Sequence, residues 1–422
     1  MLFWLITVGE LLPVDDQNVR LFRTGLLAKS LAGHGHSVVW WTSTFDHFNK
    51  RHYRDKDTEI TWLEHEGVKI RMLYGAGYRS NVSLRRVADH ARIAWKFMRA
   101  AKNMPRPDVV VCSLPTLELS VAATRYGRLM GVPVVLDVRD LWPDIFLDQA
   151  PFGTRWAVRI ILLPLFVVTR RAFQGATAIT GVTPEFVEWG LRYARRKRSP
   201  LDRDFPMGYS DKRPTDEAIV KAREFWSRFL KEDDFIVCFF GALSRQFDLD
   251  TVILAAKSLW QRNIKIRVVL CGSGDRLAYY RQQAEECENI VLPGWVGAAE
   301  IWTLMRMASV GLAPYLNIRN FTDNLPNKPL EYMSAGLPIV SCLRGVLERL
   351  LSEADCGVMY EEENPDDLAA RLIELYECPE RRNRMAQNSF QLFQDKFVAD
   401  NVYTDMMHYL EELGGRLPTK DT

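Results

Sequence analysis

Short runs of β-branched and other apolar residues alternate along the chain with longer amphipathic segments. In the first half the runs are Leu2–Val8, Ser37–Thr42, Val109–Ser113, Val134–Val138 and Ala178–Gly181. In the second half they are Phe235–Phe240, Ile266–Cys271, Ile290–Leu292, Val310–Ala313 and Ile339–Ser341. Between them, segments such as Arg20–Ala32 carry apolar residues at helical spacing. Apolar strands joined by helices are typical of parallel sheets covered on both faces, so we predict an α/β chain with two doubly wound sheets.

A charged segment with two prolines, Arg195–Pro206, interrupts this alternation, and a new helix-strand series begins near Pro214. We therefore predict an N-terminal domain over 1–205 and a C-terminal domain over 206–395. A last helix, 396–422, is expected to return to the N-terminal domain. In open sheets of this class ligands bind beyond the carboxyl ends of the strands, so the loops there are where chemistry is expected.

Composition narrows the functional classes. The chain has 55 Lys and Arg against 53 Asp and Glu, and a net charge of +2 gives no overall attraction to nucleic acid. Its seven cysteines are scattered and lack C-x-x-C spacing, which favours neither a disulfide framework nor a zinc site and fits a reducing cytoplasm. The apolar N-terminus lacks a basic region and a small-residue cleavage site, so we interpret it as a buried strand.

The most informative stretch runs from Asp323 to Val340. Asp323 and Glu331 are eight positions apart, and Pro326 and Pro329 are expected to delay the helix until near Leu330. A loop that enters a helix N-terminus offers free N–H groups and the positive end of the dipole, which suits a diphosphate. Lys328 would add a positive charge, and a carboxylate in the first turn, that of Glu331, can accept hydrogen bonds from both ribose hydroxyls. The alternative is that both acids merely favour the helix N-terminus.

This stretch resembles the E-x7-E signature of retaining glycosyltransferase family 4, with Ala335–Val340 as its characteristic tail. The first acid is Asp323 where the family usually has Glu. The resemblance implies a GT-B fold, with two Rossmann-like doubly wound domains facing across a cleft. It also implies that Asp323 contacts the donor sugar, that Glu331 contacts the ribose, and that Asn327 and Lys328 belong to the donor site.

Other segments resemble the donor-binding parts of the same family. Their candidate donor-binding residues are Gly9, Arg245, Gly272, Gly274, Trp295 and Val296. Arg245 would hold the donor phosphates, although Leu243 and Phe247 stand where further basic residues are expected. The glycines would let the backbone approach the nucleotide. Val296 would offer backbone hydrogen bonds to the nucleobase and Trp295 would stack on it, the alternative being an ordinary core Trp295.

The segment Leu136–Asp144 resembles the D-x-R-D-L-W-P stretch of bacterial O-antigen and capsule transferases related to the N-acetyl-L-fucosamine transferases. The resemblance implies that Arg139 stabilises the departing phosphate or the acceptor. Asp140 would orient an acceptor hydroxyl or pair with Arg139. The alternative is a buried Arg139–Asp140 pair that only holds the loop.

The resemblance as a whole implies a metal-independent, retaining hexosyl or N-acetylhexosaminyl transferase without a cofactor. Its donor would be a nucleotide sugar, UDP-linked in most of the family and guanosine-linked as the second choice, and its acceptor a glycan or a lipid-linked glycan of a cell-surface polysaccharide. Two alternatives stay open. One is a UDP-sugar 2-epimerase of similar fold, and the other is a non-catalytic membrane adaptor.

The apolar segment Ile160–Val168 is too short to cross a membrane and contains a proline. Basic and aromatic residues surround it, namely Arg155, Trp156, Arg159, Arg170 and Arg171. This composition predicts a segment that lies in the headgroup layer, and hence a cytoplasmic protein held peripherally on the inner face of the plasma membrane. The alternative is a buried helix whose arginines reach solvent.

Overall fold

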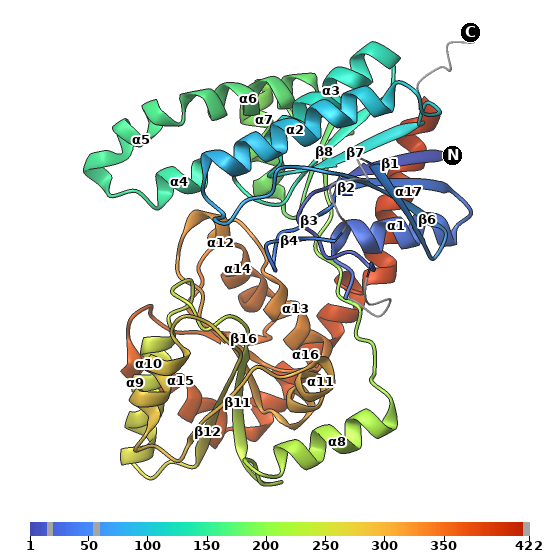
Figure 1. The fold of residues 1–422 in the computed structure, drawn as a ribbon. Helices are drawn as coiled ribbons and strands as arrows, with labels where there is room; N and C mark the ends of the chain where they lie inside the picture. Colours follow the sequence, from blue (N-terminus) through green and yellow to red (C-terminus); the bar gives the residue numbers. More distant parts are fainter. Residues whose placement is uncertain (15–19, 54–59, 417–422) are drawn as a thin grey trace. The chain divides into compact units, whose positions relative to one another are not determined.

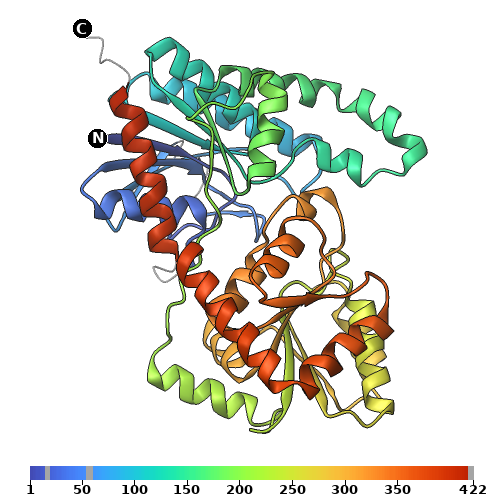
Figure 2. The ribbon, with the colours of Figure 1, turned by 180° about the vertical axis from the view of Figure 1, so that it is seen from behind.

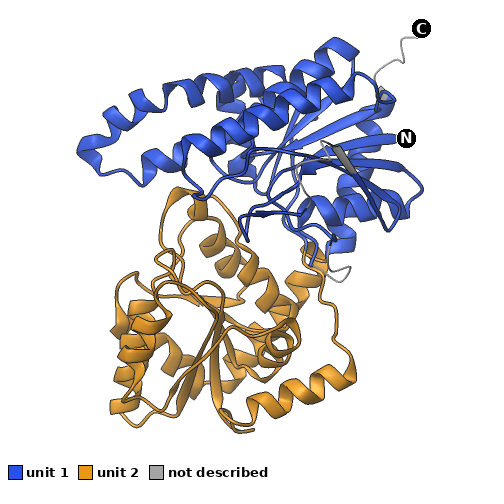
Figure 3. Ribbon diagram, viewed as in Figure 1, with its two compact units in different colours: residues 1–208, 399–422 blue, residues 209–398 orange. Residues whose placement is uncertain are grey.

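The computed structural model describes residues 1–14, 20–53 and 60–416. By contact density the chain forms two compact units, of which unit 1 comprises residues 1–208 and 399–422 and unit 2 comprises residues 209–398 (Figure 3). Each unit is built around its own parallel sheet, so the predicted α/β class with two doubly wound sheets is confirmed (Figure 1).

The sheet of unit 1 has the order β10-β9-β8-β7-β1-β2-β6-β5. Its strands are β1 (Leu2–Ile6), β2 (Ser37–Ser43), β5 (Ile60–His65), β6 (Val68–Leu73), β7 (Val109–Ser113), β8 (Val134–Val138), β9 (Ala178–Gly181) and β10 (Arg203–Asp204). All neighbours are parallel except β5 and β6. A separate antiparallel pair joins β3 (Phe45–Asp46) to β4 (Arg51–His52).

Helices cover both faces of this sheet. They are α1 (Arg23–Gly33), α2 (Leu84–Ala101), α3 (Leu117–Met130), α4 (Asp144–Asp148), the short 3-10 helix η1 (Phe152–Thr154), α5 (Arg155–Ile161), α6 (Leu163–Gly175), α7 (Pro184–Ala194) and α17 (Ala399–Arg416). Trp4 and Ile6 of β1 enter the core on one face, and Phe3 and Leu5 enter the core on the other. A strand buried on both faces has no polar side, which is why its sequence is uninterruptedly apolar.

The last helix, α17, belongs to unit 1 although it follows unit 2 in the chain. Met406, Leu410 and Leu413 pack in the same core cluster as Leu27 and Leu31 of α1. Figure 2 shows α17 in red along this face of the unit, and α1 and α17 are direct neighbours.

Unit 2 has a six-stranded parallel sheet of order β13-β12-β11-β14-β15-β16. Its strands are β11 (Phe235–Phe240), β12 (Ile266–Cys271), β13 (Ile290–Gly294), β14 (Val310–Ala313), β15 (Ile339–Ser341) and β16 (Gly357–Met359). Its helices are α8 (Asp216–Trp226), α9 (Leu249–Gln261), α10 (Leu277–Ala284), α11 (Ala298–Met307), α12 (Arg319–Thr322), α13 (Asn327–Ser334), α14 (Val346–Glu353), α15 (Pro365–Glu377) and α16 (Pro379–Lys396).

The strand orders locate the switch points of the two sheets. In unit 2 the chain winds outward in opposite directions from β11 and β14, and in unit 1 from β1 and β7. At such points the loops leaving the two strands diverge and open a crevice at the carboxyl ends, where ligands of this fold class bind. The loops after β11, β14, β1 and β7 are therefore the places to examine.

A buried ion pair fixes α1 to the sheet of unit 1. Asp137, at the end of β8, is completely buried and accepts hydrogen bonds from Arg23 Nε (2.9 Å) and Nη2 (3.1 Å). Arg139 Nε (2.8 Å) and Thr180 Oγ1 (2.9 Å) bond to the same carboxylate. Burial favours the neutral acid, but Arg23 and Arg139 outweigh it and hold the pKa of Asp137 well below its usual value.

Replacing Asp137 by Asn should destabilise unit 1 by about 3–5 kcal/mol, because the substitution leaves Arg23 buried without a counter-charge. Urea denaturation measures the loss. The exposed pair Arg198–Asp204 offers a matched control, since Asp204→Asn removes a surface carboxylate whose ion pair is worth about 1 kcal/mol or less. Equal stability of Asp137→Asn and the wild type would contradict this account.

The pH dependence follows from the same pKa. Because Asp137 has a lower pKa in the folded than in the unfolded chain, its contribution is complete above the unfolded value, about 3.9, and is lost as the pH falls below it. The free energy of unfolding of Asp137→Asn should therefore fall less steeply with acid than that of the wild type. Denaturation series at several acidic pH values would show parallel curves if the prediction is wrong.

Candidate active site

Lys328 lies at the switch point of unit 2. It is the second residue of α13, and its side chain runs against Gly241, which follows β11. A Cβ atom at Gly241 would lie 2.6 Å from Lys328 Cε, and Gly241 has a φ of 153°, so both space and backbone geometry favour glycine there.

Three aromatic rings surround the Lys328 ammonium group. Its Nζ lies 4.5 Å from the ring centroid of Phe247, 5.4 Å from that of Phe239 and 5.6 Å from that of Tyr315. The faces of these rings attract the cation and help to hold it at this position. Phe247 stands where a basic residue was expected, and its ring packs against the ammonium group of Lys328.

Helix α13 begins at Asn327, which corrects the expected start near Leu330. Pro329 does not delay the helix, because it occupies the first turn, where backbone N–H groups have no partner within the helix in any case. Glu331 consequently lies in the second turn rather than the first, one turn beyond the exposed Asn327.

Glu331 is a buried carboxylate, with only 6% of its surface exposed. Burial and then the charge of Glu331 raise the pKa of Tyr315, and the same carboxylate contributes to the raised pKa of the buried Tyr332. A buried acid beyond the first turn is not explained by a preference of acidic residues for helix N-termini. The simple structural alternative therefore fails for Glu331.

Asp323 caps the carboxyl end of α12 and thus does not stand at a helix N-terminus either. Its Oδ2 lies 3.1 Å from Nε of Arg319, one turn earlier. A Cβ atom at Gly345, the residue before α14, would lie 2.2 Å from the carbonyl oxygen of Thr322, so α14 packs closely against this end of α12. Arg319 was not predicted, although an Arg and an Asp four residues apart on a helix is a recognisable signal.

Gly272 and Gly274 have a structural requirement that the sequence did not reveal. A Cβ at Gly272 would lie 1.8 Å from the carbonyl oxygen of Gly241, and one at Gly274 would lie 2.2 Å from that of Leu243. The loops after β11 and β12 thus pack backbone against backbone. Whether these glycines also contact a nucleotide stays a prediction.

Two more candidates of unit 2 lie on its surface. Trp295 is 76% exposed, which excludes the ordinary core tryptophan, whereas the neighbouring Val296 is buried. Arg245 is exposed in the loop after β11, and with the described residues it forms neither an ion pair nor a hydrogen bond. Its guanidinium group is accordingly available to a ligand.

In unit 1, Arg139 is bound on three sides. Nε donates to Asp137, Nη2 donates to Thr24 Oγ1 (2.9 Å), and Nη1 pairs with Glu10. Glu10 in turn accepts from Thr24 N (3.1 Å) at the start of α1. The charge of Arg139 is thus matched by Asp137 and Glu10, and its pairing with Asp140 stays a prediction.

The pKa of Arg139 reflects this setting. Burial lowers it, but Asp137 and then Glu10 outweigh burial and raise it above the usual value. Arg139 is therefore a charged residue that joins the loop after β1 to the end of β8. Asp140 follows it and is half-buried. Roles of Arg139 and Asp140 toward phosphate or acceptor stay predictions.

Gly9 follows β1 with a φ of 97°, a left-handed conformation that favours glycine, and its backbone lies against His47. The Nδ1 atom of His47 is 2.7 Å from the hydroxyl of Tyr78. Burial and the nearby Lys50 and Arg86 lower the pKa of His47 to about 4, so the imidazole is neutral at neutral pH. The sequence did not indicate Tyr78.

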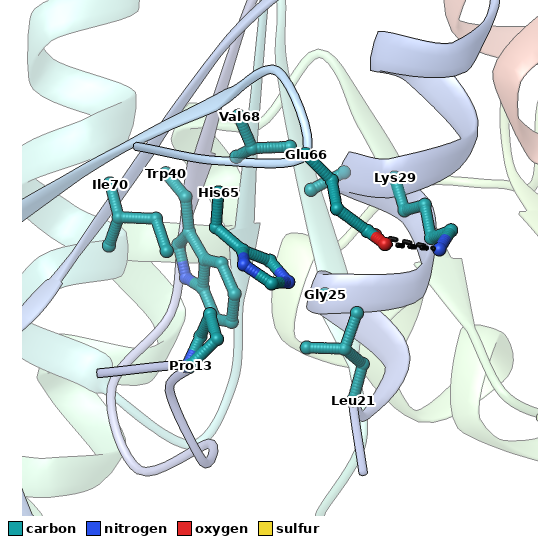
Figure 4. Close-up of a pocket in the computed structure, with 10 residues that line it drawn as sticks. Pro13, Leu21, Gly25, Lys29, Trp40, His65, Glu66, Val68 and Ile70 are labelled. Atoms are coloured by element: carbon teal, nitrogen blue, oxygen red, sulfur yellow. Dashed lines mark hydrogen bonds and ion pairs between the residues drawn. The ribbon is translucent and has the colours of Figure 1, made fainter. Parts of the chain in front are cut away.

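A pocket of about 10 Å³ between α1 and the neighbouring strands of unit 1 is too small for a sugar (Figure 4). The ion pair of Lys29 and Glu66 closes one side of it (2.7 Å), and Trp40 and His65 line another. A space of this size holds a single water molecule at most. It is therefore not a substrate site.

Helices α5 and α6 carry the residues predicted to lie on a membrane. Arg155, Trp156, Arg159, Arg170 and Arg171 are all exposed. Apolar residues between them are exposed as well, namely Ile160, Ile161, Leu163 and Val167. The alternative of a buried helix whose arginines reach solvent therefore does not fit α5, whereas α6 fits it in part, since Thr169, Ala172 and Phe173 are buried.

In the described parts of the chain, no single helix is long and apolar enough to span a membrane. The stretches Phe152–Ile161 and Leu163–Gly175 reach that length and apolarity only together, with a bend of 67° between them. Within the described residues no group of three or more His, Cys, Asp or Glu side chains is placed to hold a metal ion. Metal independence stays a prediction.

Comparison with known proteins identifies the family. Residues 220–392 match the family model "Glycosyl transferases group 1", and residues 22–200 match "Glycosyl transferase 4-like domain". Alpha-D-kanosaminyltransferase of Streptomyces kanamyceticus is 21% identical over 297 residues, which are 68% of this chain and 72% of that protein.

Solved structures share the fold over nearly the whole chain. Anabaena HepE in complex with UDP-glucose superposes with a TM-score of 0.66 at 15% identity, covering 98% of this chain and 100% of that one. WaaG, a glycosyltransferase involved in lipopolysaccharide biosynthesis, superposes with a TM-score of 0.63 at 15% identity, covering 99% and 100%.

Both family models describe sugar-transferring enzymes, and together they cover most of the chain. This assignment replaces the epimerase and the non-catalytic adaptor as interpretations. The chain therefore belongs to the group 1, family-4-like glycosyltransferases of GT-B fold, enzymes that use a nucleotide-sugar donor.

Proposed function

We propose that the protein is a retaining transferase that moves a sugar from a UDP-sugar to a lipid-linked or glycan acceptor in the synthesis of a cell-surface polysaccharide. The observation that carries the proposal is the pairing of a ring-enclosed Lys328 with the buried Glu331 one turn later on α13. The UDP-glucose bound to HepE supports the choice of nucleotide. The lipopolysaccharide role of WaaG and the D-x-R-D-L-W-P stretch support the choice of pathway.

The start of α13 would bind the donor diphosphate. Its first N–H groups and dipole favour an anion, Lys328 adds a full positive charge, and the exposed Arg245 adds a second. These charges would stabilise the diphosphate as it leaves, which is the main electrostatic demand of the reaction. The buried Glu331 would accept the two ribose hydroxyls.

The reaction would proceed on one face of the sugar. The bond between the anomeric carbon and the β-phosphate oxygen breaks, the acceptor oxygen forms the new bond on the same face, and the acceptor proton passes to the leaving phosphate. Asp323, held by Arg319, would orient the donor sugar. Asp140 would orient the acceptor hydroxyl, and Arg139 would hold the loop after β8 in which Arg139 and Asp140 lie.

Glu331→Gln should weaken UDP-sugar binding by roughly 1.5–3 kcal/mol, because an amide cannot accept hydrogen bonds from both ribose hydroxyls as a carboxylate does. Isothermal titration measures the affinity for UDP. Glu224→Gln on the exposed surface of α8 is the control and should bind like the wild type. If UDP binds both variants equally well, Glu331 does not contact the ribose.

A retaining reaction fixes the stereochemistry of the product. An α-linked UDP-sugar should yield an α-linked glycoside, since acceptor and leaving group use the same face. Proton NMR of the anomeric signal distinguishes the two products. A β-linked product would require attack from the opposite face and would end the proposed mechanism.

The exposed surface of α5 and α6 supports a peripheral membrane location. Arginines and apolar side chains share this surface, as expected of helices that lie in a headgroup layer, with apolar atoms toward the acyl chains and cations toward anionic lipid. A lipid-linked acceptor would be reached from such a position. In this proposal the segment serves to keep the enzyme at its substrate.

Reversing Arg155, Arg159, Arg170 and Arg171 to Glu should release the enzyme from anionic vesicles almost completely, since each basic residue near the surface contributes about 1 kcal/mol. Co-sedimentation measures the bound fraction, and UDP binding should persist. The matched control reverses four exposed basic residues of unit 2, namely Arg223, Arg228, Arg262 and Lys265. Retained vesicle binding by the first variant, or equal release by the second, would contradict a role specific to α5 and α6.

A further inference from the structure

A cavity of about 310 Å³ lies in unit 1, and none of the residues proposed to bind the donor lines it. It is bounded by α2, the start of α3, the segment after β8 and the break between α5 and α6. Two of its lining residues, Pro115 and Trp142, come shortly after the carboxyl ends of β7 and β8. Arg139 directly follows β8. The cavity therefore connects the reactive edge of the sheet with the proposed membrane surface.

Most of the cavity wall is apolar. The apolar lining residues are Val82, Leu84, Val87, Pro115, Leu117, Trp142, Phe146, Leu162 and Leu165. Leu84 at the rim is 89% exposed, and Leu162 and Leu165 continue into the exposed apolar surface of α5 and α6. Apolar surface of this extent on a folded protein indicates a binding partner, and here it leads from the outside into a cavity.

Two nitrogen-bearing side chains of the cavity, Arg86 and His90, can donate to an anion, although the carboxylate of Glu118 also lines it. His90 is 5% exposed, and among the described residues its Nε2 has no hydrogen-bond partner, while its Nδ1 lies 3.7 Å from Glu118. The guanidinium of Arg86 lies 4.6 Å from the ring centroid of Trp142, and its buried Nε has no partner within the described residues. A buried polar atom without a partner in the protein is expected to meet one in a ligand or in water.

We infer that this cavity binds the hydrocarbon chain and the first phosphate of a lipid-linked acceptor, whose sugar hydroxyl would receive the transferred sugar. The chain would enter from the surface of α5 and α6, and the phosphate would meet Arg86 and His90. This inference rests on the proposed function and adds to it the class of acceptor and its binding site. A water-soluble glycan has little apolar surface to bury in an apolar cavity that opens toward α5 and α6.

Dodecyl phosphate, used below its critical micelle concentration, tests the cavity directly by isothermal titration with the full chain. It should bind at least about tenfold more tightly than dodecanol or inorganic phosphate, since only it meets both the apolar wall and the donor groups of Arg86 and His90. Val87→Trp, which fills the cavity from α2, should lower this affinity at least about tenfold, whereas Ala88→Trp on the exposed side of α2 should not. Equal binding by both variants would overturn the inference.

Two further variants provide a fallback if Val87→Trp misfolds and a test of the contact between Arg86 and the phosphate. If Val87→Trp fails to fold, Leu84→Asp places a charge on the exposed rim and should weaken dodecyl phosphate binding without affecting the core. Arg86→Gln should weaken the binding of dodecyl phosphate much more than that of dodecanol. Equal loss for both ligands would mean that Arg86 shapes the wall and does not bind phosphate, and would overturn that part of the inference.

The source of the ligand and the underlying function are tested separately. Phosphatidylglycerol vesicles that displace dodecyl phosphate completely would show a site for bulk bilayer lipid and would overturn its assignment to an acceptor. UDP binding is measured on the same samples. Normal UDP binding with no binding of dodecyl phosphate would refute the cavity alone, whereas absence of UDP binding would refute the proposed function whatever the cavity does.

Discussion

The architecture of unit 1 depends on one buried negative charge, that of Asp137. Arg23 reaches this carboxylate from α1, and the same guanidinium group donates to the carbonyl oxygen of Pro206 (2.9 Å) and approaches Met406 Sδ of α17 (3.9 Å). Four segments far apart in the sequence thus meet at one charge. A buried charge of this kind is strongly unfavourable unless every partner is present, so the segments are held in one arrangement.

Arg139 extends this network to the loop after β1. Because Glu10 both pairs with Arg139 and caps the start of α1, the position of Gly9 is tied to the same charge. In unit 2 the corresponding edge is built differently. There the Lys328 ammonium group lies among three aromatic rings. The cation of unit 1 thus joins distant structural elements, whereas we propose that the cation of unit 2 binds a ligand.

The strands buried on both faces could be predicted from sequence almost to the residue, because an uninterrupted apolar run between turns leaves few alternatives. The hairpin of β5 and β6 was missed. Its turn residues Glu66 and Gly67 have φ angles of 48° and 79°, but they are not the Asn-Gly or Asp-Gly pair that usually marks such a turn in a sequence. The start of α13 was misjudged because Pro329 was treated as a helix breaker, whereas proline is tolerated in the first turn.

The partners of the candidate residues were harder to predict than the residues themselves. Nothing in the sequence links Glu10 to Arg139 or Phe239 to Lys328, because these contacts join different strands and depend on the order of strands in the sheet. Arg319, by contrast, lies one helical turn before Asp323, and this spacing alone would have indicated the pair. Local pairs are encoded in spacing, and pairs across a sheet are encoded only in the fold.

The exposed helices α5 and α6 pose a question of stability that their composition alone does not answer. None of the residues of α5, all of them in the described part of the chain, is buried in the protein. An isolated helix of this length is marginal in water, since helices in proteins gain most of their stability from packing an apolar face. Ile160 and Ile161 have no protein core to enter, so an apolar phase outside the protein would supply the missing burial. If such a phase supplied the burial, the bend between α5 and α6 at Leu162 would not need to be filled by side chains of unit 1. This is consistent with the cavity that Leu162 lines.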